Sequence, residues 1–377
     1  MVARTGSASI DRGVMAAEFQ HGLMIGKFYP PRIGHHGAIR AAAARCERFT
    51  VLVMAAAVET IPLADRMSWL RDEHRSEANV RVAGVRCDAP VDVTDRRVWA
   101  AQVAAMRAGL RAVGAPPDVD AVFSADEYFV ELARWFDAKA VMTNRTGSST
   151  SVRRDLVGRW HELAPATRAG LTTRVVVVGA ESTGTTTVAD ALARRYAARG
   201  AVWASTQCVA EYGREYTQLK WDANPDVAID ELVWESADFD AIGPEQTRQE
   251  QAAARAGSPI LICDTDAFAT GIWKRRYLGD ASGGPWMDVP PRAVYLLTGH
   301  EGVPWHDDGM REGDLAVRAA MTSWFADALT AAGHSWVLLT GTLEERLDIA
   351  VRTVEPLLAL RSQFGEPLRG PGFEETK

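Results

Sequence analysis

The chain has 377 residues, 47% of them hydrophobic and 24% charged, which is the balance of an ordinary globular protein of two or three domains. No apolar run approaches the roughly 20 residues that a membrane-spanning helix requires, and the formal net charge of -7 argues against a general nucleic-acid-binding protein. The four cysteines form no C-x-x-C pair and lack zinc-ligand spacing, so we expect reduced thiols and a cytoplasmic protein.

Short apolar strands alternate with helical stretches along both halves of the chain, which is typical of parallel sheets in α/β proteins. In the first half we expect strands at 23–25, 49–55, 80–85 and 121–123, and helices at 38–45, 63–73, 97–113 and 128–136. In the second half we expect strands at 174–178, 259–263, 293–297 and 336–339, and helices at 188–198, 315–331 and 343–358.

The pattern therefore predicts an α/β protein with two parallel-sheet domains, at 21–165 and 171–362, which meet near Pro165. Residues 1–20 are mixed and polar, without the apolar core of a signal peptide, so we expect a disordered lead-in. Residues 363–377 are rich in Gly, Pro and Glu and are typical of a frayed tail.

The first strand leads into the turn Gly26-Lys27-Phe28-Tyr29-Pro30-Pro31-Arg32-Ile33-Gly34-His35. This turn resembles the G-K-F-x-P-x-H-x-G-H signature of nucleotidylyltransferases, and in particular the bifunctional nicotinamide-mononucleotide adenylyltransferase/ribosylnicotinamide kinase family. In that family the two histidines bind the triphosphate and stabilise the charge that develops as the α-phosphate is attacked. His35 is the second histidine, whereas Arg32 replaces the first. The resemblance implies catalytic roles for both and ATP contacts for Gly26, Lys27, Phe28 and Gly34.

A second element of the same superfamily, S-x-T-x-x-R, has its counterpart in Ser148-Ser149-Thr150-Ser151-Val152-Arg153. In the superfamily this motif opens a helix, whose N-terminus holds the β- and γ-phosphates together with the arginine. The resemblance implies ATP contacts for Ser148, Thr150 and Arg153. The preceding segment, 143–147, is shorter than the family usually has.

The strand at 174–178 leads into a second glycine turn, Gly179-Ala180-Glu181-Ser182-Thr183-Gly184-Thr185-Thr186. It matches the phosphate-binding loop G-x-x-x-x-G-K-[ST] at every defined position except the lysine, where Thr185 stands. Backbone N–H groups of such a loop hold phosphate oxygens, and Thr186 would place its hydroxyl on Mg²⁺. We expect this loop to bind ATP through residues 179 and 181–186. The alternative is a glycine turn that binds no nucleotide.

The resemblance to the bifunctional family extends from about residue 23 to about residue 358. The first half contains counterparts of its R-x-x-W-L-R helix at 66–71 and of a strand-to-helix turn at 122–128. The second half contains Glu211-Tyr212-Gly213-Arg214-Glu215-Tyr216, Trp234 with Asp238 and Gln246, Asp264 with Asp266, and a lid segment at 304–311. The family implies a P-loop nucleoside-kinase-like domain here, after a Rossmann-like nucleotidylyltransferase domain.

Each implied role in the second half has a simpler alternative. Glu211 is a candidate general base for a ribose 5′-hydroxyl, or a solvated partner of Arg214. Asp264 is a candidate organiser of Mg²⁺, or a cap at the end of a strand. Arg311 is a candidate lid cation on the phosphates, or an exposed arginine in an acidic loop. The candidate substrate-binding residues are Tyr212, Arg214, Trp234 and Asp238.

The lysine count makes the change at Thr185 important, because the chain has only five lysines against 37 arginines. Loss of one transition-state contact typically lowers a rate by about 10²- to 10³-fold. Arg32 keeps a donor and a positive charge, whereas Thr185 brings no charge. The candidates to compensate are Lys220, Arg214, Lys274 and Arg311.

Three hypotheses follow. The first is an NAD-salvage-type enzyme that phosphorylates nicotinamide riboside with MgATP and transfers AMP from ATP to the mononucleotide, with the activity of each domain left open by Arg32 and Thr185. The second is a diverged enzyme of the same fold that acts on a related nucleoside or nucleotide. The third is a nucleotide-binding sensor with little catalysis. All three have ATP and a nucleoside or nucleotide as ligands, without nucleic acid or membrane, and a homo-oligomer is left open.

Overall fold

The computed structural model describes residues 17–89, 92, 94–126, 128–144, 146–279, 290–303 and 314–368. Their packing divides into two compact units, each of which is described by itself. The first comprises the described residues up to Tyr29, then Gly34–Gly147, and the described residues from Glu366 onward. The second comprises Pro30–Ile33 and Ser148–Gly365. No helix in the described part of the chain is long and apolar enough to span a membrane.

The first unit is a five-stranded parallel sheet in the order β3-β2-β1-β4-β5. The strands are β1 (Phe19–Gly26), β2 (Cys46–Ala55), β3 (Val80–Arg86), β4 (Ala121–Ser124) and β5 (Lys139–Met142). The helices of this unit are α1 (Ile33–Ala43, whose first residue is grouped with the second unit), α2 (Leu63–Glu73), α3 (Arg96–Ala112) and α4 (Phe129–Phe136). Because the chain leaves β1 on one side and returns to β4 on the other, the turn after β1 lies at a topological switch point, where α/β sheets bind ligands.

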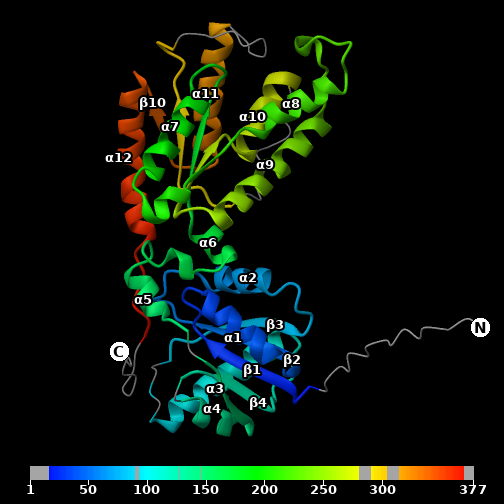
Figure 1. The fold of residues 1–377 in the computed structure, drawn as a ribbon, viewed down its shortest axis with the longest axis vertical. Coiled ribbons are helices and arrows are strands. Elements are labelled where there is room, and N and C mark those ends of the chain that lie inside the picture. The colour runs from blue at the N-terminus through cyan, green and yellow to red at the C-terminus, as the bar shows by residue number, and fades with distance from the viewer. Residues whose placement is uncertain are drawn as a thin grey trace, which may run out of the picture. The chain divides into compact units, whose positions relative to one another are not determined.

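Alternate residues of the strands supply two separate cores. Met24, Val51 and Val53 pack against α1 and α2 on one face, whereas Leu23, Leu52 and Val122 pack against α3 and α4 on the other. Figure 1 shows α1 and α2 on one side of this sheet and α3 and α4 on the other. Burial of both faces explains why the strands are continuous apolar runs rather than alternating ones.

The second unit contains another five-stranded parallel sheet, in the order β10-β9-β6-β8-β7. Its strands are β6 (Thr173–Gly179), β7 (Gln207–Val209), β8 (Ile260–Asp264), β9 (Val294–Thr298) and β10 (Trp336–Leu339). Its α-helices are α5 (Ser149–Arg154), α6 (Pro165–Leu171), α7 (Thr185–Ala197), α8 (Tyr212–Asp222), α9 (Ser236–Ala256), α10 (Ala267–Leu278), α11 (Leu315–Ala331) and α12 (Leu343–Arg361), with 3-10 turns at Trp160–Glu162, Ala201–Ser205 and Ile229–Glu231.

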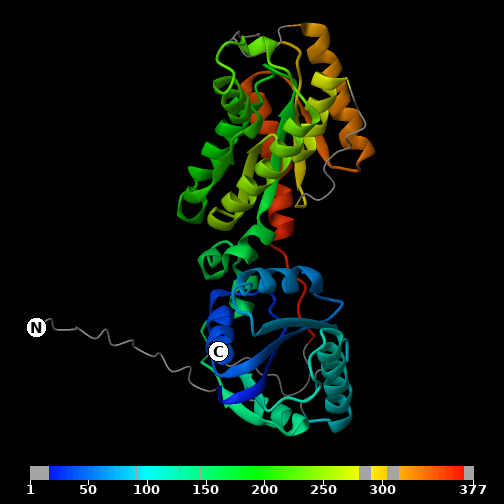
Figure 2. The same ribbon diagram turned by 90° about the vertical axis from the view of Figure 1, so that its right-hand side faces the viewer.

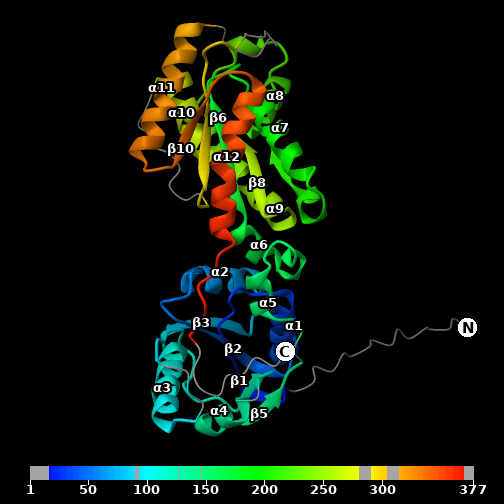
Figure 3. The same ribbon diagram turned by 90° about the vertical axis from the view of Figure 1, so that its left-hand side faces the viewer.

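Strand β6 is the centre of this sheet and is buried along its whole length. Val176 and Val178 pack against α9, α10 and α11, whereas Val175 and Val177 pack against α7 and α12. Figures 2 and 3 show this unit from two further sides, with α11 in orange and α12 in red. The predicted fold class, α/β with two parallel sheets, is confirmed.

The division by packing comes earlier in the chain than the boundary expected near Pro165. The segment between Ser148 and Pro165 packs within the second unit, where Val152, Leu156, Trp160 and Leu163 form a small apolar cluster. The indole Nε1 of Trp160 donates to the carbonyl of Gly257 at 2.9 Å. The expected lead-in also overlaps the structure, because β1 begins at Phe19.

Two glycines of the first unit differ in the space around them, which gives a test of its packing. A Cβ at Gly22 in β1 would lie 2.5 Å from Cys46 Sγ and 2.8 Å from a ring carbon of Phe49, whereas a Cβ at Gly37 in α1 would meet no atom of the described residues within 4 Å. We expect Gly22→Ala to lower the free energy of unfolding of this unit by about 1–3 kcal/mol through overpacking. Gly37→Ala should raise it by about 0.5–1 kcal/mol, because alanine is the better helix former. Urea unfolding of both variants checks this, and equal shifts would contradict the packing.

Candidate functional site

The second glycine turn has the geometry of a phosphate-binding loop. It joins the end of β6 to the start of α7, and Ser182 and Gly184 have positive φ angles of 56° and 88°. A Cβ at Gly179 would lie 2.1 Å from Thr298 Oγ1, so this position requires glycine. Thr183 Oγ1 donates to the carbonyl of Ala180 at 2.7 Å and fixes the loop. The first N–H groups of an α-helix have no partner within the helix, which is why helix N-termini such as that of α7 are suited to bind anions.

Thr186 and Asp264 lie together at the end of this loop. Thr186 Oγ1 donates to Asp264 Oδ2 at 2.6 Å. Burial raises the pKa of Asp264, and hydrogen bonds from Thr186 and Thr185 and the charge of Arg214 oppose that shift. The hydroxyl of Thr185 is therefore directed to a carboxylate, and it brings no charge to the loop.

A hydroxyl and a buried carboxylate side by side fit a magnesium ion, which takes oxygen ligands and usually keeps several of them from phosphates and water. Among the residues that the structure describes, no group of three or more His, Cys, Asp or Glu side chains could hold a metal on its own. Thr186 and Asp264 would thus hold Mg²⁺ only together with a bound polyphosphate.

Asp266, two residues further on, has a structural position. It is fully buried and caps α10 by accepting from Ala269 N at 3.1 Å. Its other oxygen accepts from Tyr295 Oη at 2.8 Å and from Arg292 Nε at 3.0 Å. Every oxygen of Asp266 is thus used within the fold, and the Mg²⁺ prediction rests on Asp264.

Asp264 and Asp266 form a matched pair for substitution. We expect Asp264→Asn to leave the melting temperature nearly unchanged, because the amide keeps the Thr186 contact and removes a buried charge. Asp266→Asn should destabilise the protein by about 3–5 kcal/mol, because it breaks a buried ion pair with Arg292. Thermal unfolding of the two variants checks this, and the reverse order would mean that the two roles are exchanged.

An aromatic cluster borders the loop. Trp234 stacks on Tyr277 with ring centroids 5.2 Å apart, and Tyr216 and Phe239 pack against Trp234. The hydroxyl of Tyr277 donates to Glu181 Oε1, a loop residue, at 3.3 Å. The sequence pointed to Trp234 and not to Tyr277, because α10 carries no motif that marks its aromatic residues.

The other predicted substrate residues lie around this cluster. Tyr216 Oη and Lys220 Nζ both donate to Asp238, at 2.8 Å and 2.7 Å, and Asp238 also helps cap α9. Tyr212 packs edge-on against Tyr216. Gln246 Oε1 accepts from the backbone N–H of Tyr212 at 2.8 Å, which fixes the start of α8. Glu211 precedes α8 as its N-cap residue, at the end of the segment after β7.

The proposed compensating cations are mostly engaged elsewhere. Lys220 is bound to Asp238, and Lys274 Nζ donates to Ser236 Oγ at 2.7 Å. Arg214 acts on the Asp264 carboxylate through its charge. Arg311 and the rest of the expected lid segment at 304–311 lie outside the described residues.

Two buried arginines that sequence reasoning missed contact the loop instead. Arg318 Nη2 donates to the carbonyl of Ser182 at 3.0 Å, and Arg346 Nη1 donates to the carbonyl of Thr183 at 2.7 Å. They come from α11 and α12, far along the chain, where no short motif identifies them.

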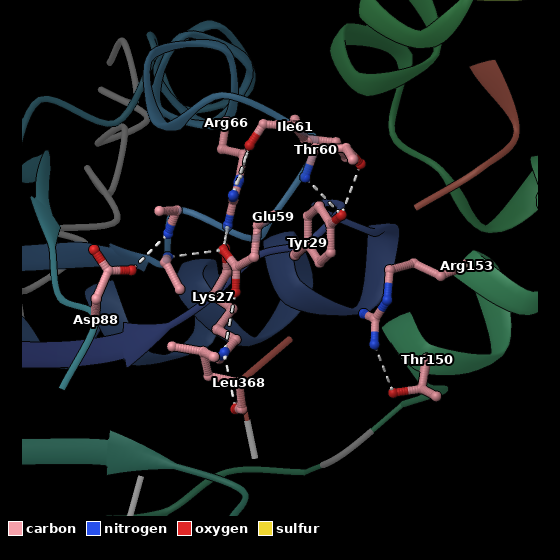
Figure 4. A network of polar contacts seen from close by, with 12 residues as sticks. Lys27, Tyr29, Glu59, Thr60, Ile61, Arg66, Asp88, Thr150, Arg153 and Leu368 are labelled. Carbon is pink, nitrogen blue, oxygen red and sulfur yellow. Dashed lines mark hydrogen bonds and ion pairs between the residues drawn. The ribbon is translucent and has the colours of Figure 1, made fainter. Parts of the chain in front are cut away.

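The turn after β1 is held by a buried polar network that Figure 4 shows. Glu59 is fully buried at its side chain and accepts from Lys27 Nζ at 3.0 Å and from Arg66 Nη1 at 2.6 Å. Arg66 also donates to the carbonyls of Lys27 and Ile61. Lys27, predicted to contact triphosphate, is therefore also an ion-pair partner of Glu59, a residue that no motif indicated.

The remaining adenylyltransferase-type residues fall in the two units. In the first unit Gly26 ends β1, Gly34 lies against Thr146, and Phe28 packs edge-on against His35 with ring centroids 5.1 Å apart. In the second unit the residues are Arg32, Ser148, Thr150 and Arg153.

Within the second unit, Arg32 is 5% exposed and turns toward α5. Its Nε donates to Ser149 Oγ at 3.1 Å, and its Nη1 lies 3.9 Å from Glu162 Oε2. Ser148 caps α5, and Arg153 Nη2 donates to Thr150 Oγ1 at 3.2 Å, a contact also drawn in Figure 4. The structure therefore brings Arg32 and the S-x-T-x-x-R segment together.

His36, next to the predicted His35, is buried and pairs with His74, with Nδ1 and Nε2 2.9 Å apart. Burial and the neighbouring His74 lower the pKa of His36 to about 3, and burial lowers the pKa of His74. Both imidazoles are neutral at pH 7, and protonation of either opposes folding.

This pair predicts a loss of stability in acid. Because the pKa of His36 is near 6.5 when unfolded and about 3 when folded, the unfolded chain binds more protons between these values. The contribution of His36 to the free energy of unfolding is complete above about pH 6.5. Below that pH it falls by up to about 1.4 kcal/mol per pH unit. We expect His36→Gln/His74→Gln to flatten the stability profile of this unit between pH 6.5 and 4, measured by urea unfolding. His161→Gln, at an exposed histidine, should leave the slope unchanged.

Fold and site together define an α/β protein of two parallel-sheet units, the second with a P-loop. Residues 174–346 match a family model described as an AAA domain, in agreement with the loop at the end of β6.

Comparison with curated proteins gives weak homology to a trifunctional NAD biosynthesis/regulator protein, NadR. The chain is 21% identical over 313 residues to NadR of Escherichia coli (strain K12), and 21% identical over 310 residues to NadR of Salmonella typhimurium; each match covers 77% of this chain and 71% of the relative.

Among solved structures, a NadR protein in complex with NR matches with a TM-score of 0.59 at 20% identity, over 94% of this chain and 98% of that one. A NadR protein in complex with NAD and AMP-PNP matches with a TM-score of 0.57 at 18% identity, over 91% and 97%. These likenesses show the fold, and the weak homology supports the resemblance to the bifunctional family that the motifs carry.

Proposed function

We propose that the protein is an NAD-salvage-type enzyme with two ATP-dependent activities. One is phosphorylation of nicotinamide riboside, which yields nicotinamide mononucleotide and ADP. The other is transfer of AMP from ATP to the mononucleotide, which yields NAD and pyrophosphate. The family resemblance, the weak homology to NadR and the likeness to NadR structures with NR, NAD and AMP-PNP support it.

One observation carries the kinase half of the proposal: Tyr277 links the aromatic cluster to Glu181 of the phosphate-binding loop. The nicotinamide ring of the riboside is planar and positively charged, and aromatic faces attract such cations. A nucleoside with its ring at Trp234 or Tyr277 would therefore have its ribose near the loop.

The chain's own residues then have distinct tasks. The N–H groups at the start of α7 would bind phosphate oxygens, and Thr186 and Asp264 would hold Mg²⁺ together with them. The magnesium ion, when bound, offsets the charge of the β- and γ-phosphates. Glu211 accepts the proton of the ribose 5′-hydroxyl, and Asp238 orients Lys220 and Tyr216 toward the nucleoside. Tyr212 and Arg214 complete the substrate side, and Arg311, outside the described residues, stays a candidate contact of the phosphates.

In the adenylyltransferase half, His35 and Arg32 supply donors and charge for the triphosphate. Gly26, Lys27, Phe28 and Gly34 form the turn around it, and Ser148, Thr150 and Arg153 bind the β- and γ-phosphates. Arg32 contacts Ser149 and Lys27 contacts Glu59, so a bound triphosphate would share both cations with these partners.

Separate assays of the two half-reactions test the proposal. We expect the purified protein to form both products, each detected by chromatography. Asp264→Asn should lower riboside phosphorylation by about 10²- to 10³-fold and leave adenylyl transfer unchanged, and His35→Ala should do the reverse.

The outcomes separate the three hypotheses. Absence of both products with nicotinamide substrates would contradict the proposal. Turnover of a different nucleoside in a substrate panel would favour the diverged enzyme. ATP binding by calorimetry without any turnover would favour the sensor.

A further inference from the structure

The phosphate-binding loop lacks the lysine that such loops carry, yet two buried guanidinium groups contact it. Arg318 is 1% exposed and Arg346 is 3% exposed. They donate to the carbonyls of two successive loop residues, Ser182 and Thr183. Since an arginine stays protonated in proteins, both bring permanent positive charge to the loop.

Neither charge is neutralised within the part of the chain that the structure describes. Glu59 balances Arg66 in the first unit, and Glu250 and Asp266 balance Arg292 in the second, but no described carboxylate forms an ion pair with Arg318 or Arg346. Burial lowers the pKa of both guanidinium groups, because it penalises the charged form. A buried cation without a counter-ion is costly unless an anion binds beside it.

The two arginines differ in how far their donors are used. Arg346 donates from all three nitrogens to carbonyls, at Thr183, Gly299 and Gly341, so it clamps the loop to two neighbouring segments. Among the described residues, Arg318 donates only from Nη2, to Ser182 and more weakly to Val303. Its Nε and Nη1 are buried and have no hydrogen-bond partner in that part of the chain.

The arginines contact carbonyl groups of the loop, and this direction favours an effect on the ligand that the loop binds. In a planar trans peptide the carbonyl and the following N–H point to opposite sides. Arg346, on the carbonyl of Thr183, therefore polarises the N–H of Gly184, the residue that caps α7, toward the side where phosphate binds. The N–H of Thr183, behind the carbonyl that Arg318 contacts, donates to the carbonyl of Ala180 at 3.3 Å, so Arg318 acts on a bound anion through its charge. Linked hydrogen bonds strengthen one another in this way.

We propose that Arg318, supported by Arg346, supplies the positive charge that a lysine at position 185 supplies in other phosphate-binding loops. The ligand it serves is the polyphosphate of a nucleoside triphosphate. Arg318 is a positioning residue: it holds the carbonyl of Ser182 and acts on the bound polyphosphate through its positive charge. This inference rests on the proposed function, because it requires ATP at the second glycine turn.

A rescue experiment tests it. Binding of MgATP and of inorganic tripolyphosphate is measured by calorimetry in a His35→Ala background, so that the adenylyltransferase-type turn contributes little. We expect Arg318→Gln, which keeps donors but loses the charge, to weaken both ligands by about 10- to 100-fold. Arg318→Lys should keep most of the affinity. Arg352→Gln, at an exposed arginine of α12, should change neither.

The decisive readout is the effect of Thr185→Lys in two backgrounds. If Arg318 does the lysine's task, Thr185→Lys raises affinity strongly beside Arg318→Gln and little beside the native arginine. A merely structural role of Arg318 gives no such rescue. Where Arg318→Gln does not fold, as judged by circular dichroism, a large gain from Thr185→Lys beside native Arg318 overturns the inference and a small gain supports it.

The other possible results separate failure of this inference from failure of the proposed function. If Arg318→Gln binds both ligands as tightly as the parent, or if Thr185→Lys gains equally in both backgrounds, the inference is wrong and the proposed function stands. If the parent binds neither ligand, the proposed function of the kinase half fails, and this inference fails with it.

Discussion

Buried arginines that donate to backbone carbonyls fix both glycine turns of this protein. In the first unit Arg66 donates to the carbonyl of Lys27 at 2.9 Å and thereby sets the turn after β1. In the second unit Arg346 and Arg318 do the same for the turn after β6. Such turns direct N–H groups toward a ligand and leave carbonyls on the opposite side, which must find donors when they are buried. Arginine suits this task because its fork offers five donors.

The two turns differ in electrostatics despite this shared construction. Arg66 is balanced by Glu59, which also binds Lys27, so the network of the first turn carries a single positive charge spread over two cations and one carboxylate. Among the residues that the structure describes, the arginines of the second turn have no carboxylate partner. The second turn therefore depends more on a bound anion, whereas the first is fixed before any ligand binds.

Much of the fold could be predicted from the sequence, because strands such as β6 contain a continuous apolar run, 175–178, and a glycine turn follows it directly. Helix α8 gave no such signal, since none of its residues is buried and its pattern lacks an apolar face. Strand β5 is a four-residue edge strand with one buried side chain, too short for a pattern. Local pattern places the domain boundary near Pro165. It does not indicate that Trp160 donates to the carbonyl of Gly257, because these residues are far apart in sequence.

The candidate site was predictable where it lies within motifs and not where distant elements complete it. Thr186 and Asp264 could be paired in advance, because a strand-end carboxylate and the loop hydroxyl meet at the same edge of a parallel sheet. Tyr277, Arg318 and Arg346 could not, because each reaches the loop from a helix whose register only tertiary packing determines. A motif defines which backbone groups face the ligand. The charged side chains that contact those backbone groups, here Arg318 and Arg346, come from distant parts of the chain.

This distinction bears on the two departures from the family pattern. Arg32 keeps a cation inside its motif, but that cation is already engaged by Ser149 and lies near Glu162, so its availability to a triphosphate depends on the exchange of those partners. Thr185 removes the cation from its motif, but the buried arginines keep positive charge at the loop from outside it. The first turn, which looks less altered in sequence, has its Arg32 cation near the carboxylate of Glu162. The second turn, which looks more altered, retains positive charge that no described carboxylate balances. The two halves therefore need not gain or lose activity together, and the severity of a motif change is a poor guide to which half is active.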